Sequence, residues 1–307
     1  MPKLSVIVPV YWNEQSLSPL FARLLEIEKG LYQEKVELEL IFVDDGSGDN
    51  SLQELLKIKQ KRPSTRVIKL SRNFGAIHAS KTGAQFVTGD AFLMLAADLQ
   101  DPPELILEMV ERWQAGTKFV ICVRRNRDDP LLSRIFASIY YGLVRLYVIK
   151  DYPKGGFDLA LMDKVMLPYL QNSGKFIYTP LFMHSLGFRS ETIYYDRQKR
   201  LYGHSRWTFQ KKLIASLDVL LGFSVIPIRI MSLIGLAVST ISFCYGAWII
   251  TNAFLGRVDV RGFATIIAIL SFLLGTIILM LGIIGEYLWR IFEEVNKRPE
   301  VVIEAIY

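Results

Sequence analysis

Two long stretches without charge constrain the fold of this chain more than any other feature. Residues 230–251 and 262–285 contain no Asp, Glu, Lys or Arg. As helices, both are long enough to cross a hydrocarbon core of roughly 30 Å. Buried helices of a soluble protein are the alternative, but such helices seldom continue this far without a charge. The sequence therefore predicts two membrane-spanning helices, and the short linker at 252–261 makes them a hairpin.

The charges that flank the hairpin predict its orientation. The linker carries Arg257 and Arg261. More basic side chains precede the first apolar stretch: Arg197, Lys199, Arg200, Arg206, Lys211, Lys212 and Arg229. Because positive charge favours the cytosolic side, we expect a multi-pass protein of the cell inner (plasma) membrane with its N-terminal domain and both termini in the cytosol. The apolar run after Lys3 is short, which favours a buried strand over an export signal.

Composition supports a division of the chain into a soluble part and a membrane part. Hydrophobic residues are 51% of the chain and the mean hydropathy is +0.28, but the excess lies beyond residue 219. We expect a soluble domain at 1–205, an amphipathic juxtamembrane helix at 206–229, the hairpin at 230–286 and a cytosolic tail at 287–307. The net charge is +6, and since the basic residues concentrate beside the hairpin, we expect anionic lipid and no nucleic acid as the partner.

The soluble part alternates short apolar runs with amphipathic stretches. The predicted strands are residues 4–10, 38–43, 67–70, 91–95 and 119–123, and the predicted helices include 16–30, 51–60 and 103–115. This alternation predicts an α/β fold with a largely parallel sheet covered by helices. In such sheets ligands bind at the carboxyl ends of the strands.

Polar groups follow the first two predicted strands. The first strand leads into Tyr11-Trp12-Asn13-Glu14, and the second into Asp44-Asp45-Gly46-Ser47. Adjacent carboxylates followed by a glycine suit hydrogen bonding to the base or ribose of a nucleotide, although a solvated turn is the alternative. A dinucleotide fingerprint is excluded, because position 51 is serine where the third glycine would stand.

The segment after the fourth strand combines a metal-binding pattern with a helix start. Asp98 and Gln100, as alternate residues of an extended stretch, project to the same side and could bind one hard cation, Mg²⁺ or Mn²⁺. Such an ion would stabilise a departing nucleoside diphosphate. Asp101, before two prolines and three residues before Glu104, has the pattern of a helix N-cap with a capping box.

Taken together, these motifs resemble family 2 glycosyltransferases of the polyisoprenyl-phosphate type, which include dolichol-phosphate mannose synthases and bacterial bactoprenol glucosyltransferases. The resemblance runs from about residue 4 to 290 and also includes Leu70-Ser71-Arg72-Asn73-Phe74-Gly75 and Tyr202-Gly203-His204-Ser205-Arg206. It implies the GT-A nucleotide-diphosphosugar fold. One position departs from the pattern: many relatives have an aspartate where this chain has Ala96, so its metal site has one carboxylate fewer.

The resemblance also implies roles for particular residues. The catalytic residues would be Asp98, Arg124 and Asp158, and the metal ligands Asp98 and Gln100. The nucleotide sugar would contact Pro9, Tyr11, Asn13, Glu14, Asp44, Asp45, Arg72, Lys81 and Asp98. The acceptor phosphate would contact Arg124, Arg127, Arg134, Arg200, Ser205 and Arg206, since guanidinium groups suit phosphate oxygens.

The expected reaction is inverting transfer of a hexose, glucose from UDP-glucose, to polyprenyl (undecaprenyl) phosphate at the cytosolic membrane face. A lipid monophosphate has a second pKa of about 6, so its oxygen is already an anionic nucleophile at neutral pH. The product would serve cell-envelope glycan modification, such as that of lipopolysaccharide or O-antigen. We expect a homo-oligomer, and a separate flippase and downstream glycosyltransferase to use the product.

Three alternatives remain open from the sequence. Mannose or another sugar could replace glucose. A processive polysaccharide synthase would share the nucleotide motifs, but would be expected to carry Gln-x-x-Arg-Trp, and here Gly203 stands at the glutamine position before Arg206-Trp207. A non-catalytic membrane scaffold that binds nucleotide sugar is the third.

Overall fold

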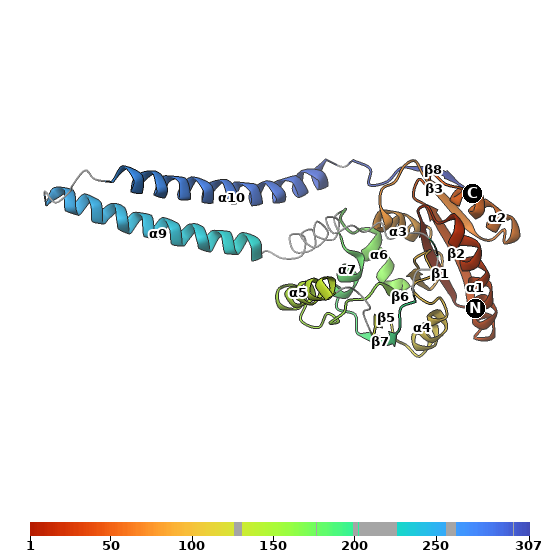
Figure 1. The fold of residues 1–307 in the computed structure, drawn as a ribbon. Helices are drawn as coiled ribbons and strands as arrows, with labels where there is room; N and C mark the ends of the chain where they lie inside the picture. Colours follow the sequence, from red (N-terminus) through yellow and green to blue (C-terminus); the bar gives the residue numbers. More distant parts are fainter. Residues whose placement is uncertain (126–130, 176, 199–201, 203–225, 256–261, 297) are drawn as a thin grey trace. The chain divides into compact units, whose positions relative to one another are not determined.

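The computed structural model describes residues 1–125, 131–175, 177–198, 202, 226–255, 262–296 and 298–307 (Figure 1). The chain divides into two compact units. The first comprises Met1–Ile214 with Pro299–Tyr307, and the second is Ala215–Arg298. Most of the predicted juxtamembrane helix, residues 206–225, lies outside the described residues.

The first unit is built on a mixed sheet with the strand order β7-β5-β6-β4-β1-β2-β3-β8. All five predicted strands are confirmed within two residues at each end. The strands are β1 (Lys3–Val10), β2 (Glu37–Asp44), β3 (Arg66–Leu70), β4 (Ala91–Met94), β5 (Phe119–Arg124), β6 (Leu159–Asp163), β7 (Ser190–Tyr195) and β8 (Ile303–Ile306).

The sheet is less uniformly parallel than predicted. Strands β1 to β4 form a parallel group, and β5 is parallel to β7. The antiparallel pairs all involve β6 or β8, two strands that the sequence analysis did not find. Strand β6 lies between β4 and β5 and runs against both, so it interrupts the parallel order that βαβ alternation suggests.

Helices cover both faces of this sheet and explain why its strands are apolar without alternation. Along β2, Leu40 and Phe42 join one core with helices α1, α2 and α4, while Ile41 and Val43 join a second core with α3. Gly83 of α3 lies so close to β1 that a β-carbon there would come within 2.4 Å of Ile7 Cγ2. The helices are α1 (Glu14–Gln33), α2 (Ser51–Lys61), α3 (Ala76–Ala84), α4 (Leu105–Gln114), α5 (Leu131–Tyr147), α6 (Leu167–Gln171) and α7 (Thr179–Ser185), with a 3₁₀ turn at Lys164–Met166.

The last residues of the chain complete the sheet. Strand β8 pairs antiparallel with β3, and Tyr307 N donates to Val67 O at 2.8 Å (Figure 1). Lys69 Nζ pairs with Glu304 Oε1 at 2.6 Å across the two strands. The sequence analysis assigned residues 287–307 to a cytosolic tail; of these, residues 299–307 belong to the first unit.

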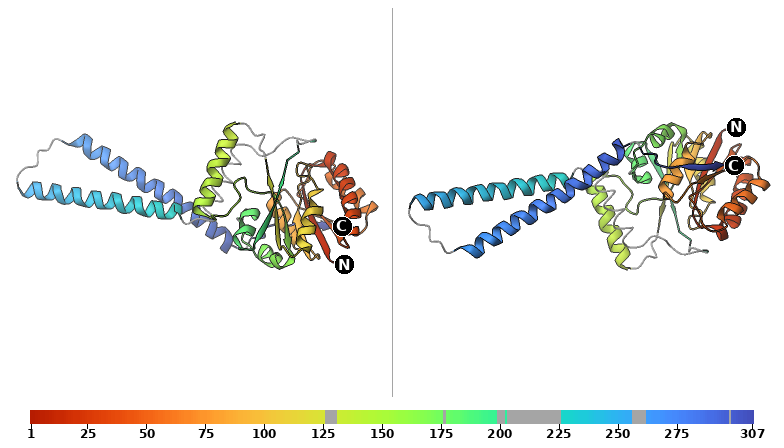
Figure 2. Two further views of the ribbon diagram at one scale, coloured as in Figure 1. Left: turned by 90° about the horizontal axis from the view of Figure 1, so that it is seen from below. Right: turned by 90° about the horizontal axis from the view of Figure 1, so that it is seen from above.

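The described residues of the second unit form two long helices, α9 (Ile226–Phe254) and α10 (Phe263–Val295). The two helices cross near the start of α9 and lie further apart at its other end (Figure 2). Each contains a segment that is long and apolar enough to cross a membrane, at Ile228–Trp248 and Phe272–Val295. The first agrees closely with the predicted span at 230–251. The second begins ten residues later than the predicted span at 262–285, because α10 continues well beyond it.

Candidate active site

The predicted ligand edge is assembled by the register of β1 and β2. Val10 is paired with Asp44, so the segments after both strands leave the sheet at the same edge. Asp45 N donates to Val10 O at 2.8 Å, which holds the two segments together. The nucleotide motifs, which lie more than 30 residues apart in the sequence, therefore meet in space as predicted from the direction of the strands.

Asp44 has a buried carboxylate that is only half satisfied. Its Oδ1 accepts from Ser47 N at 3.3 Å, whereas its Oδ2 has no hydrogen-bond partner among the described residues. Burial raises the pKa of Asp44 above its ordinary value, although the hydrogen bonds from Ser47 oppose this. A buried acceptor without a partner is costly, and such atoms often mark a place where a ligand or water binds.

Asp45 holds the neighbouring loop in place. Its two oxygens accept from Phe74 N at 2.7 Å and from Gly75 N at 2.9 Å. Gly46 makes this turn possible, because its φ is +66° and a β-carbon there would come within 2.5 Å of the Arg72 backbone. Burial also raises the pKa of Asp45, although the hydrogen bonds from the backbone N–H groups of Phe74 and Gly75 lower it. The structure thus gives Asp45 a role in the loop, and its predicted contact with nucleotide stays a prediction.

Asn13 and Glu14 likewise stabilise the edge from within. Asn13 Oδ1 accepts from Tyr11 N at 3.0 Å, and Asn13 N donates to Ser51 Oγ at 2.8 Å. The Glu14 carboxylate accepts from Asn50 N at 2.9 Å. These bonds tie the end of β1 to the start of α2, so this part of the edge is preorganised before any ligand binds.

Arg72 lies at this edge, and Lys81 is turned into the protein. The Arg72 guanidinium lies 4.1 Å from the centre of the Phe74 ring and donates to Asn73 O. Lys81 is buried on α3, where its ammonium pairs with Glu300 at 2.8 Å.

The surroundings of Lys81 involve three segments of the chain. Its ammonium also donates to Ser173 O and Gly174 O, each at 3.1 Å, and Glu300 accepts in addition from His78 Nδ1 at 2.8 Å. Burial alone would raise the pKa of Glu300, but the bonds from His78 and Lys81 outweigh it and lower that pKa. Lys81 therefore joins α3, the segment after α6 and the C-terminal segment, and a direct contact with nucleotide stays a prediction.

The predicted metal motif lies in a turn and not in the extended stretch that we expected. Leu99 has φ +59° and is buried, and Gln100 N donates to Asp98 Oδ1 at 3.2 Å. The extended geometry was wrong because Leu99 packs into the core, which requires the backbone to turn there. Asp98 and Gln100 nevertheless stand on either side of Leu99 at the ligand edge.

Carboxylate and amide oxygens fit Mg²⁺ or Mn²⁺ as hard ligands. Within the described residues no three His, Cys, Asp or Glu side chains gather into a metal-binding group. The predicted donor set, Asp98 with Gln100, stays a prediction, and phosphate oxygens of a substrate would have to complete it.

Asp101 does not cap a helix, which corrects the capping-box prediction. Helix α4 begins at Leu105 with Glu104 as its N-cap residue, and no side chain caps it. Asp101 is buried and accepts instead from Tyr195 OH at 2.6 Å. The reason is the turn after β4, which directs this carboxylate towards β7, while Glu104 pairs with Arg23 at 2.7 Å.

Two arginines and two carboxylates surround the end of β5. Arg124, paired in register with Tyr195 of β7, forms an ion pair with Asp158. Arg197, which the sequence analysis did not assign to the site, lies with its Nε 3.5 Å from Asp101 Oδ1. Burial lowers the pKa of Arg197 and so does the positive charge of Arg124, while Asp101 and Asp98 raise it. A cluster of this kind can bind a phosphate anion.

The other predicted acceptor residues have no described side chain. Arg127, Arg200, Ser205 and Arg206 lie outside the described residues, and Arg134 belongs to α5 but its side chain is not described. Their predicted contacts with the acceptor phosphate stay predictions.

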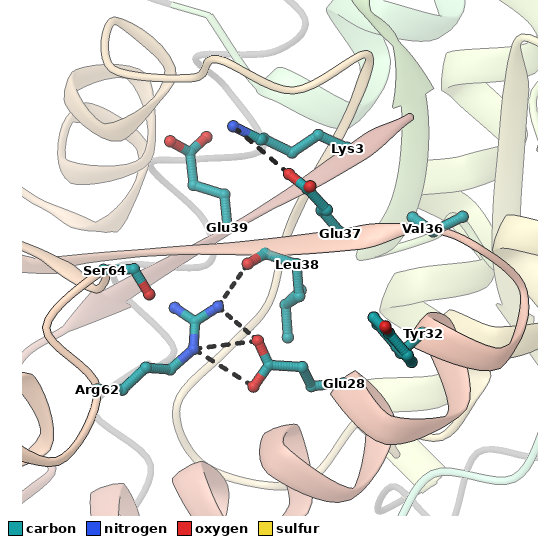
Figure 3. A pocket seen from close by; sticks show the side chains of 9 residues that line it. All are labelled: Lys3, Glu28, Tyr32, Val36, Glu37, Leu38, Glu39, Arg62 and Ser64. Carbon is teal, nitrogen blue, oxygen red and sulfur yellow. Dashed lines mark hydrogen bonds and ion pairs between the residues drawn. The ribbon is translucent and has the colours of Figure 1, made fainter. Parts of the chain in front are cut away.

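A separate hollow of about 320 Å³ lies at the opposite edge of the sheet, beside Lys3 and Glu37 at the amino ends of β1 and β2 (Figure 3). Its Arg62 is already bound by Glu28 at 2.6 Å and donates to Leu38 O. Ligands of such sheets bind at the carboxyl ends, so this hollow is not part of the candidate site.

The chain is similar in sequence to known glycosyltransferases. The profile of Glycosyl transferase family 2 matches residues 5–167. An uncharacterized glycosyltransferase of Synechocystis is 34% identical, with 99% of this chain and 96% of that protein covered. A bactoprenol glucosyl transferase of Shigella phage SfII is 31% identical, with 98% of this chain and 97% of that protein covered.

A solved structure shares the fold of this chain. It is that of glucosyl-3-phosphoglycerate synthase from Mycobacterium tuberculosis in complex with Mn²⁺, UDP-glucose and phosphoglyceric acid. The TM-score is 0.50 at 15% identity, with 72% of this chain and 78% of that chain covered. The predicted GT-A fold is confirmed in the form of a mixed α/β sheet.

Proposed function

The chain belongs to glycosyl transferase family 2, and on this premise we propose that it transfers glucose from UDP-glucose to a polyprenyl phosphate, with inversion at the anomeric carbon. The observation that carries this proposal is the extent of the match to a bactoprenol glucosyl transferase, which covers 98% of this chain and therefore includes both apolar helices. A likeness confined to the soluble unit would support only nucleotide-sugar chemistry.

The donor would bind at the edge formed by β1 and β2. Asp44 offers an oxygen there that has no hydrogen-bond partner within the described part of the chain, and the loops that carry Tyr11 and Arg72 are held in place by Asn13 and Asp45. A ribose hydroxyl or a base N–H would satisfy that oxygen. Pro9, Glu14 and Lys81 would also contact the nucleotide sugar in this proposal.

Asp98 and Gln100 would hold a Mg²⁺ or Mn²⁺ ion at the diphosphate. When bound, the ion neutralises negative charge that develops on the leaving nucleoside diphosphate. In this proposal the turn at Leu99 would hold the Asp98 and Gln100 side chains at the ligand edge.

The acceptor phosphate would bind near the end of β5. Arg124 and Arg197 supply guanidinium groups there, and Asp158 holds Arg124 in place. The phosphate oxygen is the nucleophile and is already anionic at neutral pH, so no strong general base is needed. The enzyme then positions reactants and neutralises charge. Arg127, Arg134, Arg200, Ser205 and Arg206 would add to this site.

The two units suggest how the enzyme meets its lipid. Both flanks of Ala215–Arg298 continue into the first unit, so a hairpin in the membrane enters and leaves at one face. The basic residues before α9 favour the cytosolic face of the plasma membrane. The hairpin would anchor a homo-oligomer of the enzyme, and a separate flippase and a downstream glycosyltransferase would use the product in cell-envelope modification.

The test is transfer of labelled sugar to purified polyprenyl phosphate by the full chain in detergent. UDP-glucose, GDP-mannose and other nucleotide sugars are supplied separately, with Mg²⁺, Mn²⁺ or a chelator. We expect one glucose per lipid with inverted configuration. Preference for GDP-mannose would show that mannose, and not glucose, is the transferred sugar. A growing polymer would indicate a processive synthase. Without product from any donor, the proposal fails and a scaffold becomes the better interpretation.

A further inference from the structure

Trp12 has an unusual backbone conformation at the ligand edge. Its φ is +57°, a left-handed conformation that is unfavourable for a residue with a side chain. The conformation is held by Ser47 Oγ, which accepts from Trp12 N at 3.1 Å. The N–H groups of Tyr11 and Asn13 on either side are also bound by side-chain oxygens. Strain that is maintained by this many contacts often marks a functional residue.

The indole is backed on one side and open on another. It lies against Gly48, where a β-carbon would come within 3.1 Å of Trp12 Cζ2. The Tyr11 ring meets it edge-on, with the ring centres 6.3 Å apart. Even so, Trp12 is 48% exposed. Trp113 differs, because it packs against the core and its Nε1–H donates to Asp163 at 2.9 Å.

The surroundings of Trp12 indicate what it would bind. Ser47, which holds the Trp12 backbone, also bonds to the Asp44 carboxylate, and the second oxygen of that carboxylate has no partner among the described residues. A flat aromatic surface beside a carboxylate that needs a donor fits a nucleobase, which has a π face and N–H groups at its edge.

We propose that Trp12 stacks on the nucleobase of the donor, and so adds to the nucleotide site a residue to which the resemblance gave no role. This inference rests on the proposed function, because it requires a nucleoside diphosphate donor. Stacking tolerates every base, so Trp12 supplies affinity for the nucleoside while the polar groups at the edge choose the base.

Calorimetric titration of the full chain in detergent, in the presence of Mn²⁺, tests this assignment. UDP, UDP-glucose and inorganic pyrophosphate are the probes. We expect Trp12→Ala to weaken UDP and UDP-glucose alike, by roughly fivefold to hundredfold. The affinity for pyrophosphate, which has no base, stays within about twofold. Trp12→Phe keeps an aromatic ring and restores most of the UDP affinity.

Tryptophan fluorescence gives a second readout that does not depend on catalysis. UDP quenches the wild type and Trp113→Phe to a similar extent, and the quenching that saturates with UDP is lost in Trp12→Phe. Trp113→Phe is the matched control, since it removes an indole from the same unit far from the ligand edge.

Each of the following outcomes overturns the assignment. If the Trp12→Ala variant binds UDP as tightly as the wild type, Trp12 does not stack on the base. Weakening of UDP-glucose alone places Trp12 against the sugar, and equal weakening of pyrophosphate indicates a general disturbance of the loop. A wild type that transfers glucose while Trp12→Ala retains UDP affinity refutes only this inference, whereas a wild type that binds no nucleoside diphosphate refutes the proposed function as well.

Discussion

Arg124, the last residue of β5, forms an ion pair with Asp158, the residue before β6. Antiparallel pairing of β5 with β6 brings the two positions to the same edge of the sheet. Asp158 therefore orients the guanidinium before a phosphate arrives. In the proposed reaction the phosphate would share Arg124 with Asp158.

Replacing Arg124 should weaken the acceptor and not the donor. Hydrogen bonds to a charged group contribute about 1.5–3 kcal/mol, so Arg124→Ala should lower kcat/KM for polyprenyl phosphate by roughly tenfold to a hundredfold. Arg124→Lys should recover little, because lysine lacks the planar fork. Steady-state kinetics and UDP titration check this, with Arg112→Ala, which breaks an ion pair to Glu108 on α4, as control. Weakened UDP binding in Arg124→Ala would assign the residue to the donor instead.

Asp98 should be required for the effect of a divalent ion on the nucleotide complex. We expect Mn²⁺ to increase the thermal stabilisation that UDP gives the wild type, and we expect this increase to disappear in Asp98→Ala. Glu104→Ala, in the same segment but paired with Arg23, should retain it. Differential scanning fluorimetry measures the Mn²⁺ effect in both variants. Glucose transfer should fail in Asp98→Ala and persist in Glu104→Ala. An unchanged Mn²⁺ effect in Asp98→Ala would show that the ion binds elsewhere.

Breaking the pair between Glu300 and Lys81 should destabilise the first unit. The Lys81 ammonium is buried, and removing one partner of a buried pair costs about 3–5 kcal/mol. Glu300→Ala should therefore lower the unfolding temperature clearly. Glu304→Ala is the control, since its exposed pair with Lys69 should leave the temperature nearly unchanged. Equal effects of the two variants would contradict a special role for Glu300.

Asp44 should make the ligand-free protein less stable at neutral pH. Burial raises the pKa of Asp44 in the folded protein above its ordinary value of 3.8. Its favourable contribution to the free energy of unfolding is therefore fully present below pH 3.8 and is lost as the pH rises through the pKa of the folded state. Asp44→Asn should thus unfold at a higher temperature than the wild type at neutral pH, and the difference should shrink towards pH 3.8. Its affinity for UDP should fall.

Asp90 provides a control of opposite sign for this experiment. A hydrogen bond from Lys164 lowers the pKa of Asp90, and one from Lys3 N adds to this. The contribution of Asp90 to the free energy of unfolding is present above the pKa of the unfolded state and is lost as the pH falls through the lowered pKa of the folded state. Asp90→Asn should therefore unfold at a lower temperature than the wild type at neutral pH. If both asparagine variants shift in the same direction, desolvation of Asp44 is not the cause.

The sequence predicted those parts of the fold that depend on local pattern. Strands buried on both faces, such as β2 with Phe42 and Val43, read as continuous apolar runs. Strands β6, β7 and β8 were missed, because their places in the sheet depend on partners distant in sequence. The pairing of Lys81 with Glu300, 219 residues away, could not be predicted for the same reason.

Within the site, residue types were easier to predict than conformations. The order of the strands brought the segments of Asp44 and Tyr11 to one edge, as expected. An extended backbone was predicted for Asp98–Gln100, but packing of Leu99 makes this segment a turn. Asp101 was assigned to a helix cap because its contact with Tyr195 is a tertiary contact that the sequence does not reveal. Arg197 was not assigned to the site, because only the contact between Tyr195 of β7 and Asp101 brings it there.

The pairing of β8 with β3 has a consequence for how the protein is made. Glu304 and Lys69 lie 235 residues apart in the chain, and both long apolar helices are synthesised between them. Strand β8 is therefore synthesised after both of these helices. Until then β3 is an exposed edge strand, which is open to pairing with other chains. The sheet of the first unit can therefore be completed only after α9 and α10 have been synthesised and the chain has returned to β3.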